Sequence, residues 1–325
     1  MTVKSIVEAI RDTLDEELAN DPRVMVLGED VGKSGGVFRA TDGLQAKYGI
    51  DRVVDMPVAE AVIIGASIGL ATAGMVPVAE MQFLGFSHHA FHQISHQLAR
   101  WRYRTNGRFH APVTIRAPFG GGVRAPELHS DAFENIFTQG PGLKIVAPAT
   151  AADAAGLLRA SIRDEDPVLF LEPLKGYRLV RDDVPDGAHL VPLGKARIAR
   201  PGGDVTVIAW SSMVQTALDA ATRAAALGID VEVLDLRSLV PLDVDAIAES
   251  VARTGRAVVV QEAPKTGGFA SEVVATIQDE AFLSLEAPVL RVSGWDAPYP
   301  MPLIEDQYVP SVERVLFAIQ RTVGF

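Results

Sequence analysis

Residues 52–80 read RVVDMPVAEAVIIGASIGLATAGMVPVAE and predict a strand, a helix and a second strand. The apolar segment RVVD stops before Pro57, and a helix is predicted to begin at Glu60. No further charge occurs before Glu80, and Pro77 is predicted to begin the next strand. A strand, a helix and a strand in this order are typical of a parallel sheet that is covered by helices.

The uncharged residues 61–79 approach the length of a membrane span. Their composition indicates otherwise, because Ala, Gly, Ser and Thr dominate and the strand at Pro77 leaves a helix of about four turns. We expect a buried helix. Gly65 and Gly69 form a ridge of small residues that allows close approach of another helix, in a soluble core or at a subunit interface.

The same alternation continues on both sides of this stretch. Apolar segments that predict strands lie near residues 24, 113, 143 and 167, with amphipathic segments between them. Between residues 178 and 203 the helical period is lost, and the alternation restarts with DVTVIAW at residues 204–210. We therefore predict two α/β domains, residues 1–187 and residues 188–325, the first with a parallel sheet and helices on both faces and the second smaller.

Composition narrows the classes of function. The chain has 325 residues and a net charge of −11, which disfavours a nucleic-acid or anionic-membrane partner and suits a basic protein partner. Cysteine is absent, so disulfides, thiolate metal ligands and a cysteine nucleophile are excluded. The first residues, MTVKSIVEAIRDTL, lack the basic flank and apolar block of a secretion signal, and a cytoplasmic location is expected.

Three glycine-containing segments resemble nucleotide-binding loops at first sight. GEDVGKS at residues 28–34 is one residue short of a phosphate-binding loop, and Glu29 and Asp30 would oppose a phosphate. FGGGV at residues 119–123 and KSGGV at residues 33–37 lack the spacing of a dinucleotide turn. An ATPase or a self-contained nicotinamide oxidoreductase is therefore disfavoured.

The histidine-rich segment FSHHAFHQISH, residues 86–96, raises the question of a metal site. On an α-helix His88, His92 and His96 would share one face. A catalytic zinc helix would also carry a glutamate beside its first histidine, and none is present. We predict a partly buried, hydrogen-bonded helix in preference to a metal site.

Glu60 is a lone carboxylate at the start of an apolar helix. One interpretation is an acid in the first turn, stabilised by the helix dipole. The other is a buried acid that exchanges a proton with a ligand, which would speak against a purely structural docking subunit.

Ten segments in order, among them VLGEDVG, RVVDMPVAE, VPVAEMQF, PVTIRAPFGGGV, ELHSD, GLKIVAPAT and VEVLDLRSLVPLD, resemble the β subunit of thiamine-diphosphate-dependent 2-oxo acid dehydrogenases. The resemblance covers nearly the whole chain. FRATDGLQAKYG, LGFS and PFGGGVRAPELHSD are most similar to the pyruvate-type bacterial members, with branched-chain (2-oxoisovalerate) and acetoin-type enzymes as alternatives.

The resemblance implies a thiamine-diphosphate pyrimidine-binding domain followed by a smaller transketolase C-terminal-like α/β domain. It also implies oxidative decarboxylation of a 2-oxo acid with reductive acylation of a lipoyl domain. Glu60 falls on the family's catalytic acid, which hydrogen-bonds a pyrimidine nitrogen of the cofactor. Phe86 matches an aromatic residue that stacks on the pyrimidine, and Val58 matches an apolar neighbour. Glu29 matches an acid near the cofactor and between two active sites.

His129, in ELHSD, matches a histidine that faces the mouth of the active site and supports acyl transfer to lipoamide. The alternative is a loop histidine that caps the following helix. His89 and His92 depart from the resemblance, since pyruvate-type relatives often carry acids there that contribute to a proton passage. Because histidine is less reliably anionic than an acid, the resemblance does not carry that role over to this chain.

The family motif that binds Mg²⁺ and diphosphate, G-D-G followed by N-N, is missing from the sequence. The resemblance therefore implies an α subunit that supplies it, in an α₂β₂ heterotetramer, with the subunit-binding and lipoyl domains of a dihydrolipoyl acyltransferase as further partners. A structural monovalent cation, such as K⁺, is implied near Ser161, Asp164 and Asp166. A plain turn at a helix end is the alternative there.

Overall fold

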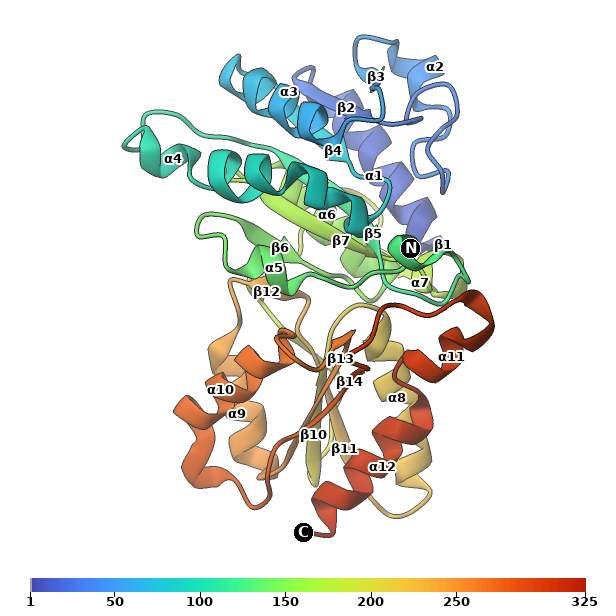
Figure 1. Ribbon diagram of the computed structural model, residues 1–325, viewed down its shortest axis with the longest axis vertical. Helices are drawn as coiled ribbons and strands as arrows, with labels where there is room; N and C mark the ends of the chain where they lie inside the picture. The colour runs from blue at the N-terminus through green and yellow to red at the C-terminus, as the bar shows by residue number, and fades with distance from the viewer. Residues whose placement is uncertain (1) are drawn as a thin grey trace.

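The computed structural model describes residues 2–325 and contains two α/β units, one above the other in Figure 1. The larger unit has a seven-stranded sheet of order β12-β6-β7-β5-β4-β2-β3, in which only β12 is antiparallel to its neighbour. Its strands are β2 (Val24–Gly28), β3 (Val53–Asp55), β4 (Val76–Glu80), β5 (Thr114–Phe119), β6 (Lys144–Val146), β7 (Val168–Pro173) and β12 (Ser238–Val240).

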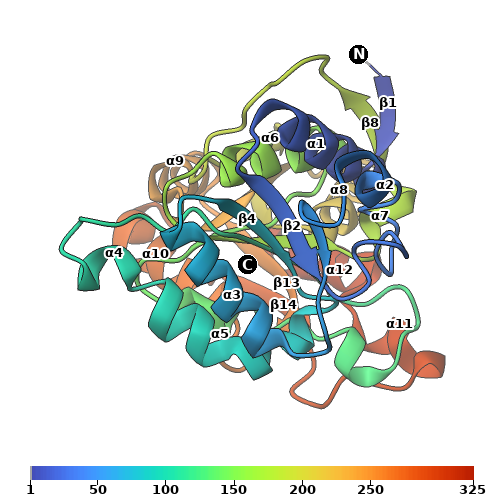
Figure 2. The same ribbon diagram turned by 90° about the horizontal axis from the view of Figure 1, so that it is seen from above.

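Helices cover both faces of this sheet, because successive strand residues point to opposite sides. Val26 packs in one apolar cluster with α1 (Ile6–Asn20) and α6 (Ala151–Ile162), whereas Leu27 packs in another with α3 (Glu60–Thr72). Figure 2 shows α1 and α6 on one side of β2 and β4, with α3 on the other. Short elements complete the unit: α2 (Leu44–Tyr48), η1 (Leu84–Ala90), η2 (His92–Leu98), α4 (Trp101–Arg104), η3 (Glu127–His129), α5 (Asn135–Thr138) and α7 (Gly176–Leu179).

The smaller unit has a five-stranded sheet of order β14-β13-β10-β11-β9, parallel except for β9. Its strands are β9 (Arg197–Arg200), β10 (Val205–Ala209), β11 (Val231–Asp235), β13 (Ala257–Pro264) and β14 (Leu290–Gly294). Its helical elements are α8 (Ser212–Ala225), α9 (Val244–Thr254), α10 (Ala270–Ala281), η4 (Phe282–Ser284), η5 (Pro302–Ile304), α11 (Glu305–Tyr308) and α12 (Val312–Val323). The predicted α/β fold with parallel sheets is confirmed.

The two units are joined more closely than the alternation along the chain suggests. A short ribbon of β1 (Thr2–Ser5) and β8 (Arg181–Val184) precedes the predicted boundary at residues 187/188. Beyond it, β12 returns to the larger sheet and pairs with β6, so that Leu239 shares one core cluster with Ile145. The boundary itself stays a prediction.

The helix predicted from the uncharged stretch is α3, and only one of its faces is buried. Ile63 and Ile64 are fully buried, whereas Val62 is 53% exposed. A Cβ atom at Gly65 or Gly69 would have no heavy atom within 4 Å. The predicted buried helix is therefore buried on one face, and no helix of residues 2–325 packs on the glycine ridge, where a subunit interface stays a prediction. Within the same residues, none of the helices has both the length and the apolar character to cross a membrane.

An ion cluster lies inside the larger sheet and joins the carboxyl ends of β4 and β7 to the middle of β5, which lies between them. Arg116 of β5 is fully buried and donates to Glu80 of β4 at 2.5 Å and to both oxygens of Glu172 of β7 at 2.7 and 3.0 Å. The Tyr177 hydroxyl also donates to Glu172. Burial raises the pKa of Glu80, while the Arg116 charge opposes that rise.

Removal of the Arg116 charge should destabilise the fold strongly. Arg116→Met leaves two buried carboxylates without their cation, so we expect a loss on the order of 3–5 kcal/mol in the free energy of unfolding, measured by urea denaturation. Arg223→Met is the control, because Arg223 pairs with Glu313 with both side chains more than half exposed, at 54% and 69%. Its effect should stay within about 1 kcal/mol. Equal losses in both variants would contradict a stabilising role for the buried cluster.

Candidate functional site

The predicted site residues follow strands whose carboxyl ends meet at one edge of the larger sheet. Glu29 comes directly after β2, and Glu60 begins α3, which follows β3. Phe86 lies in η1, after β4, and His129 ends η3, after β5. Parallel strand order thus gathers segments that lie a hundred residues apart in the sequence.

Glu60 and Glu29 are two buried acids at this edge. Glu60 is 9% exposed and occupies the first turn of α3, next to an N-cap residue, Ala59, that makes no side-chain cap. Glu29 is also buried, and its Oε1 has no hydrogen-bond partner within residues 2–325. Burial, and then the negative charge of Glu60, raise the pKa of Glu29. The two carboxyl groups therefore interact, and one of their oxygens lacks a donor.

Phe86 and His129 form a ring cluster with Phe83. The centroid of His129 lies 4.6 Å from that of Phe83 and 5.0 Å from that of Phe86, and both contacts are edge-on. His129 Nδ1 is buried and has no partner among the described residues. The alternative that His129 caps the next helix is wrong, because α5 has Glu134 as its N-cap residue and no side-chain cap. Val58 is 83% exposed, on the loop before α3.

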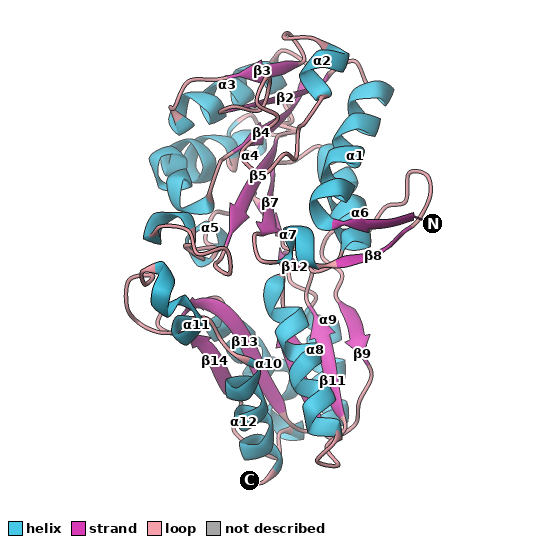
Figure 3. Cartoon of the chain, turned by 90° about the vertical axis from the view of Figure 1, so that its right-hand side faces the viewer, coloured by secondary structure: helices cyan, strands magenta, loops and turns pink. Residues whose placement is uncertain are grey.

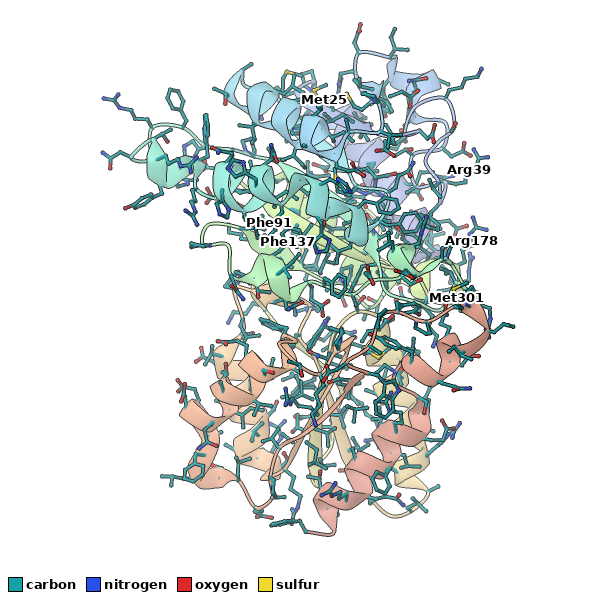
Figure 4. All side chains as sticks on the ribbon, viewed as in Figure 1. Met25, Arg39, Phe91, Phe137, Arg178 and Met301 are labelled. Carbon is teal, nitrogen blue, oxygen red and sulfur yellow. The ribbon has the colours of Figure 1, made fainter. Side chains whose placement is uncertain are left out.

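The histidine-rich segment is a partly buried helix, as predicted, but it is not α-helical: residues Leu84–Ala90 form a 3₁₀-helix and residues His92–Leu98 a π-helix. The rings of His92 and His96 still lie side by side, with centroids 5.5 Å apart. Packing fixes the segment: the rings of Phe91 and Phe137 lie with centroids 5.6 Å apart and planes tilted by 45° (Figure 4). Within residues 2–325, His, Cys, Asp and Glu form no group of three suited to a metal ion.

The carboxylates near the predicted cation position already have cationic partners. Asp164 accepts hydrogen bonds from Lys144 Nζ at 2.6 and 2.8 Å, and Asp166 accepts one from Arg102 Nε at 2.6 Å. The Ser161 hydroxyl donates to the Leu157 carbonyl. The cation site stays a prediction that would depend on backbone carbonyls.

Three buried acids at the boundary of the two units were not predicted from the sequence. They are Glu134 on the loop after η3, Glu262 near the end of β13 and Glu305 at the start of α11. Glu134 is fully buried, its Oε1 accepts from Trp210 Nε1 at 3.1 Å, and its Oε2 has no partner among the described residues. For Glu262 the sequence did offer a signal, because this acid follows the apolar residues of the strand AVVVQEAP.

The side chains at the carboxyl edge of the larger sheet fit an aromatic cofactor that carries hydrogen-bond donors and basic nitrogens. The buried carboxyl groups of Glu29 and Glu60 offer hydrogen-bond acceptors, and the unpartnered Glu29 oxygen leaves one acceptor to fill. The Phe86 ring next to His129 offers an apolar surface. Such a combination is typical of a site that binds a heteroaromatic ring and moves a proton on it.

Comparison with known proteins defines the class first. The transketolase pyrimidine-binding domain model matches residues 3–179, and the transketolase C-terminal domain model matches residues 194–315. The chain is similar to the pyruvate dehydrogenase E1 component subunit beta of Bacillus subtilis, with 50% identity over all 325 residues and 100% of each chain covered. The protein of the same name from Staphylococcus aureus is 48% identical, again over 100% of both chains. The chain belongs to the family of pyruvate dehydrogenase E1 component β subunits, which is thiamine-diphosphate-dependent and forms part of an oxidoreductase.

Solved structures agree with this class. An inactive β4 tetramer of a split-gene transketolase has a TM-score of 0.82 and 27% identity, and the match covers 98% of each chain. A transketolase mutant from Pichia stipitis has a TM-score of 0.71 and 15% identity, and the match covers 100% of this chain and 46% of that one. The second likeness supports the fold alone.

Glu134 should make the stability of the chain depend on pH. Burial raises its pKa from 4.5 to about 7, so between these values the folded chain keeps a proton that the unfolded chain releases. The free energy of unfolding must therefore fall as the pH rises through this window. Glu134→Gln keeps an acceptor for Trp210 and abolishes this titration. The fall in unfolding free energy between about pH 5 and pH 8 should be smaller by on the order of 2–3 kcal/mol.

The measurement is urea denaturation of parent and variant at both pH values. Glu280→Gln, at an exposed position, is the control and should reproduce the parental dependence on pH. A parental slope retained in Glu134→Gln would show that Glu134 does not titrate in this window.

Proposed function

We propose that the chain is the β subunit of an enzyme that oxidatively decarboxylates pyruvate with thiamine diphosphate and acetylates the lipoyl domain of an acyltransferase. The observation that carries the proposal is the buried Glu60 beside Glu29, at the sheet edge that also holds the Phe86–His129 pair. The names of the relatives favour pyruvate over branched-chain 2-oxo acids or acetoin.

We assign the roles of these residues as the family resemblance implies. Glu60 would share a proton with a pyrimidine ring nitrogen, and its burial strengthens that hydrogen bond. Phe86 would orient the ring by stacking, with Val58 as an apolar neighbour and Glu29 as a second buried acid near the cofactor. Thiamine diphosphate, when bound, supplies the carbon nucleophile and accepts the electron pair that decarboxylation releases.

His129 would act in the second half of the reaction. Its Nδ1 is buried, which leaves Nε2 as the nitrogen that can hydrogen-bond an incoming acyl acceptor. The edge-on contacts with Phe83 and Phe86 fix the plane of the imidazole ring. An imidazole held in this way suits proton transfer to or from the lipoyl sulfur.

An α subunit would complete the site in an α₂β₂ assembly, located in the cytoplasm. The sequence lacks the motif for Mg²⁺ and diphosphate, so the α subunit would hold both. The open face of α3, with Val62, Gly65 and Gly69, is suited to close approach of a partner helix. We include in the proposal a K⁺ near Ser161 and docking of the acidic smaller unit on the basic subunit-binding domain of an acyltransferase.

The isolated chain should not decarboxylate pyruvate when thiamine diphosphate and Mg²⁺ are added. Activity should appear after reconstitution with the α subunit co-purified from native cells, and pyruvate should be turned over faster than 3-methyl-2-oxobutanoate. Release of CO₂ and size-exclusion chromatography measure both properties. Turnover by the isolated chain would contradict the heteromeric site, and a preference for the branched substrate would favour the branched-chain enzyme.

Glu60→Gln should lower kcat of the reconstituted enzyme by roughly 10²–10⁴, the usual contribution of a general acid–base group. Glutamine keeps the size of the side chain and removes the transferable proton. Hydrogen–deuterium exchange at the thiazolium carbon should slow in parallel. Glu272→Gln, in the first turn of α10, is the matched control, because an acid there affects stability through the helix dipole by only about 0.3–1 kcal/mol. Rates within a few-fold of the parent for Glu60→Gln would refute its catalytic role.

A further inference from the structure

Residues 119–131, here called the glycine loop, leave β5 and reach the smaller unit before they return with His129. Gly120 and Gly122 have φ values of +82° and +91°, and a Cβ atom at Gly121 would lie 1.5 Å from the Tyr299 hydroxyl oxygen. The loop therefore requires glycine at the point where it passes the second unit. This close passage brings its backbone amides to buried carboxylates of that unit.

Glu262 is the first of these carboxylates. It lies in β13, is 5% exposed, and accepts hydrogen bonds from the Gly121 N–H and, at 3.0 Å, from the Ser212 hydroxyl. Burial raises its pKa, and the Gly121 amide opposes that rise. A charged acceptor bonds a backbone N–H more strongly than a neutral one, so this contact ties the loop to β13.

Glu305 is the second and is 1% exposed. Its Oε1 accepts from the Gly122 N–H at 2.5 Å and its Oε2 from the Arg124 N–H at 3.0 Å. The Arg124 guanidinium also reaches the Pro302 carbonyl and the Asp306 carboxylate, each at 2.6 Å. Figure 3 shows α11, which begins with Glu305, at the boundary of the two units. Each carboxylate oxygen of Glu305 accepts one backbone N–H, and only a carboxylate offers an acceptor to both N–H groups.

The opposite end of the glycine loop carries His129. The His129 N–H donates to Pro126 O at 2.9 Å, and only five positions separate His129 from Arg124. The ring then rests against Phe83 and Phe86 of the larger unit. Because the loop is tied at one end to the smaller unit and at the other to the ring cluster, the amide contacts set where the imidazole can lie.

We propose that Glu262 and Glu305 are positioning residues, which hold the glycine loop from the smaller unit and thereby place His129 for acyl transfer. The proposal rests on the function proposed above for His129. It gives the smaller unit a direct part in the second half of the reaction, in addition to docking.

Glu305→Gln tests the contact itself, because an amide offers one acceptor oxygen and sets its NH₂ group against the second N–H. Asp182→Asn is the matched control: Asp182 likewise accepts two backbone amides, of Ala151 and Ala152 at 3.0 and 3.3 Å, at the start of α6. Hydrogen exchange of the full chain, read by mass spectrometry, should quicken by roughly tenfold at residues 122–124 in Glu305→Gln alone. Unchanged exchange there, or an equal rise throughout the chain, would overturn the proposal.

A double-variant cycle in the reconstituted α₂β₂ enzyme tests whether Glu305 acts through His129. Glu305→Gln should lower acetyl transfer to a lipoyl domain by about tenfold, and it should add less than about twofold in a His129→Ala background. Losses that multiply would overturn positioning through His129. If Glu305→Gln does not fold, Glu305→Asp, which keeps both oxygens on a shorter chain, should give smaller changes in both measurements, and no change in either would overturn the proposal.

The two levels of inference fail separately. A parental assembly that does not decarboxylate pyruvate would refute the proposed function, whatever the exchange of the glycine loop. Normal decarboxylation together with unchanged exchange in Glu305→Gln would refute the positioning role alone.

Discussion

The buried ion cluster around Arg116 connects three adjacent strands at the edge of the sheet where the candidate site lies. Its bonds to Glu80 and Glu172 fix the ends of β4 and β7 against β5. The segments that carry Phe86 and His129 leave the sheet from β4 and β5, so their starting points are set by this cluster. Well-packed apolar side chains could stabilise a sheet equally well, and the geometric specificity of the bidentate contact is what the cluster adds.

The second unit contributes to the same edge through two carboxylates that accept hydrogen bonds from backbone amides of the larger unit. Glu262 and Glu305 bond to N–H groups of the glycine loop, not to its side chains, so the loop sequence is constrained mainly by the need for glycine at close approach. Return of β12 to the larger sheet limits how far the two units can separate. The smaller unit, which the sequence pattern presents as a separate domain, therefore helps to hold the loop that leads to the candidate site.

The sequence predicts those features of the structure that depend on local composition and on the periodic spacing of apolar residues. Apolar segments became strands in the larger and smaller sheets, and Glu60 stood out because its neighbours carry no charge. The roles of Phe86 and His129 came from family resemblance, since neither residue has a distinctive local pattern. The 3₁₀- and π-helical turns after β4 were missed because they depend on tertiary packing around Phe91. Glu305 was missed because its partner, Gly122, lies 183 positions earlier, a pairing that one sequence does not encode locally.

The open ridge of α3, on which we propose that a partner helix rests, sets folding and assembly in opposition. Gly65 and Gly69 lie inside a helix, where glycine costs about 0.5–1 kcal/mol relative to alanine, and added methyl groups would meet open space. A directed-evolution screen that rewards only the thermal resistance of the lone chain would therefore drive both positions to alanine. Such variants would be more heat-resistant as isolated chains, but they would have lost the shallow surface on which a second helix backbone can rest.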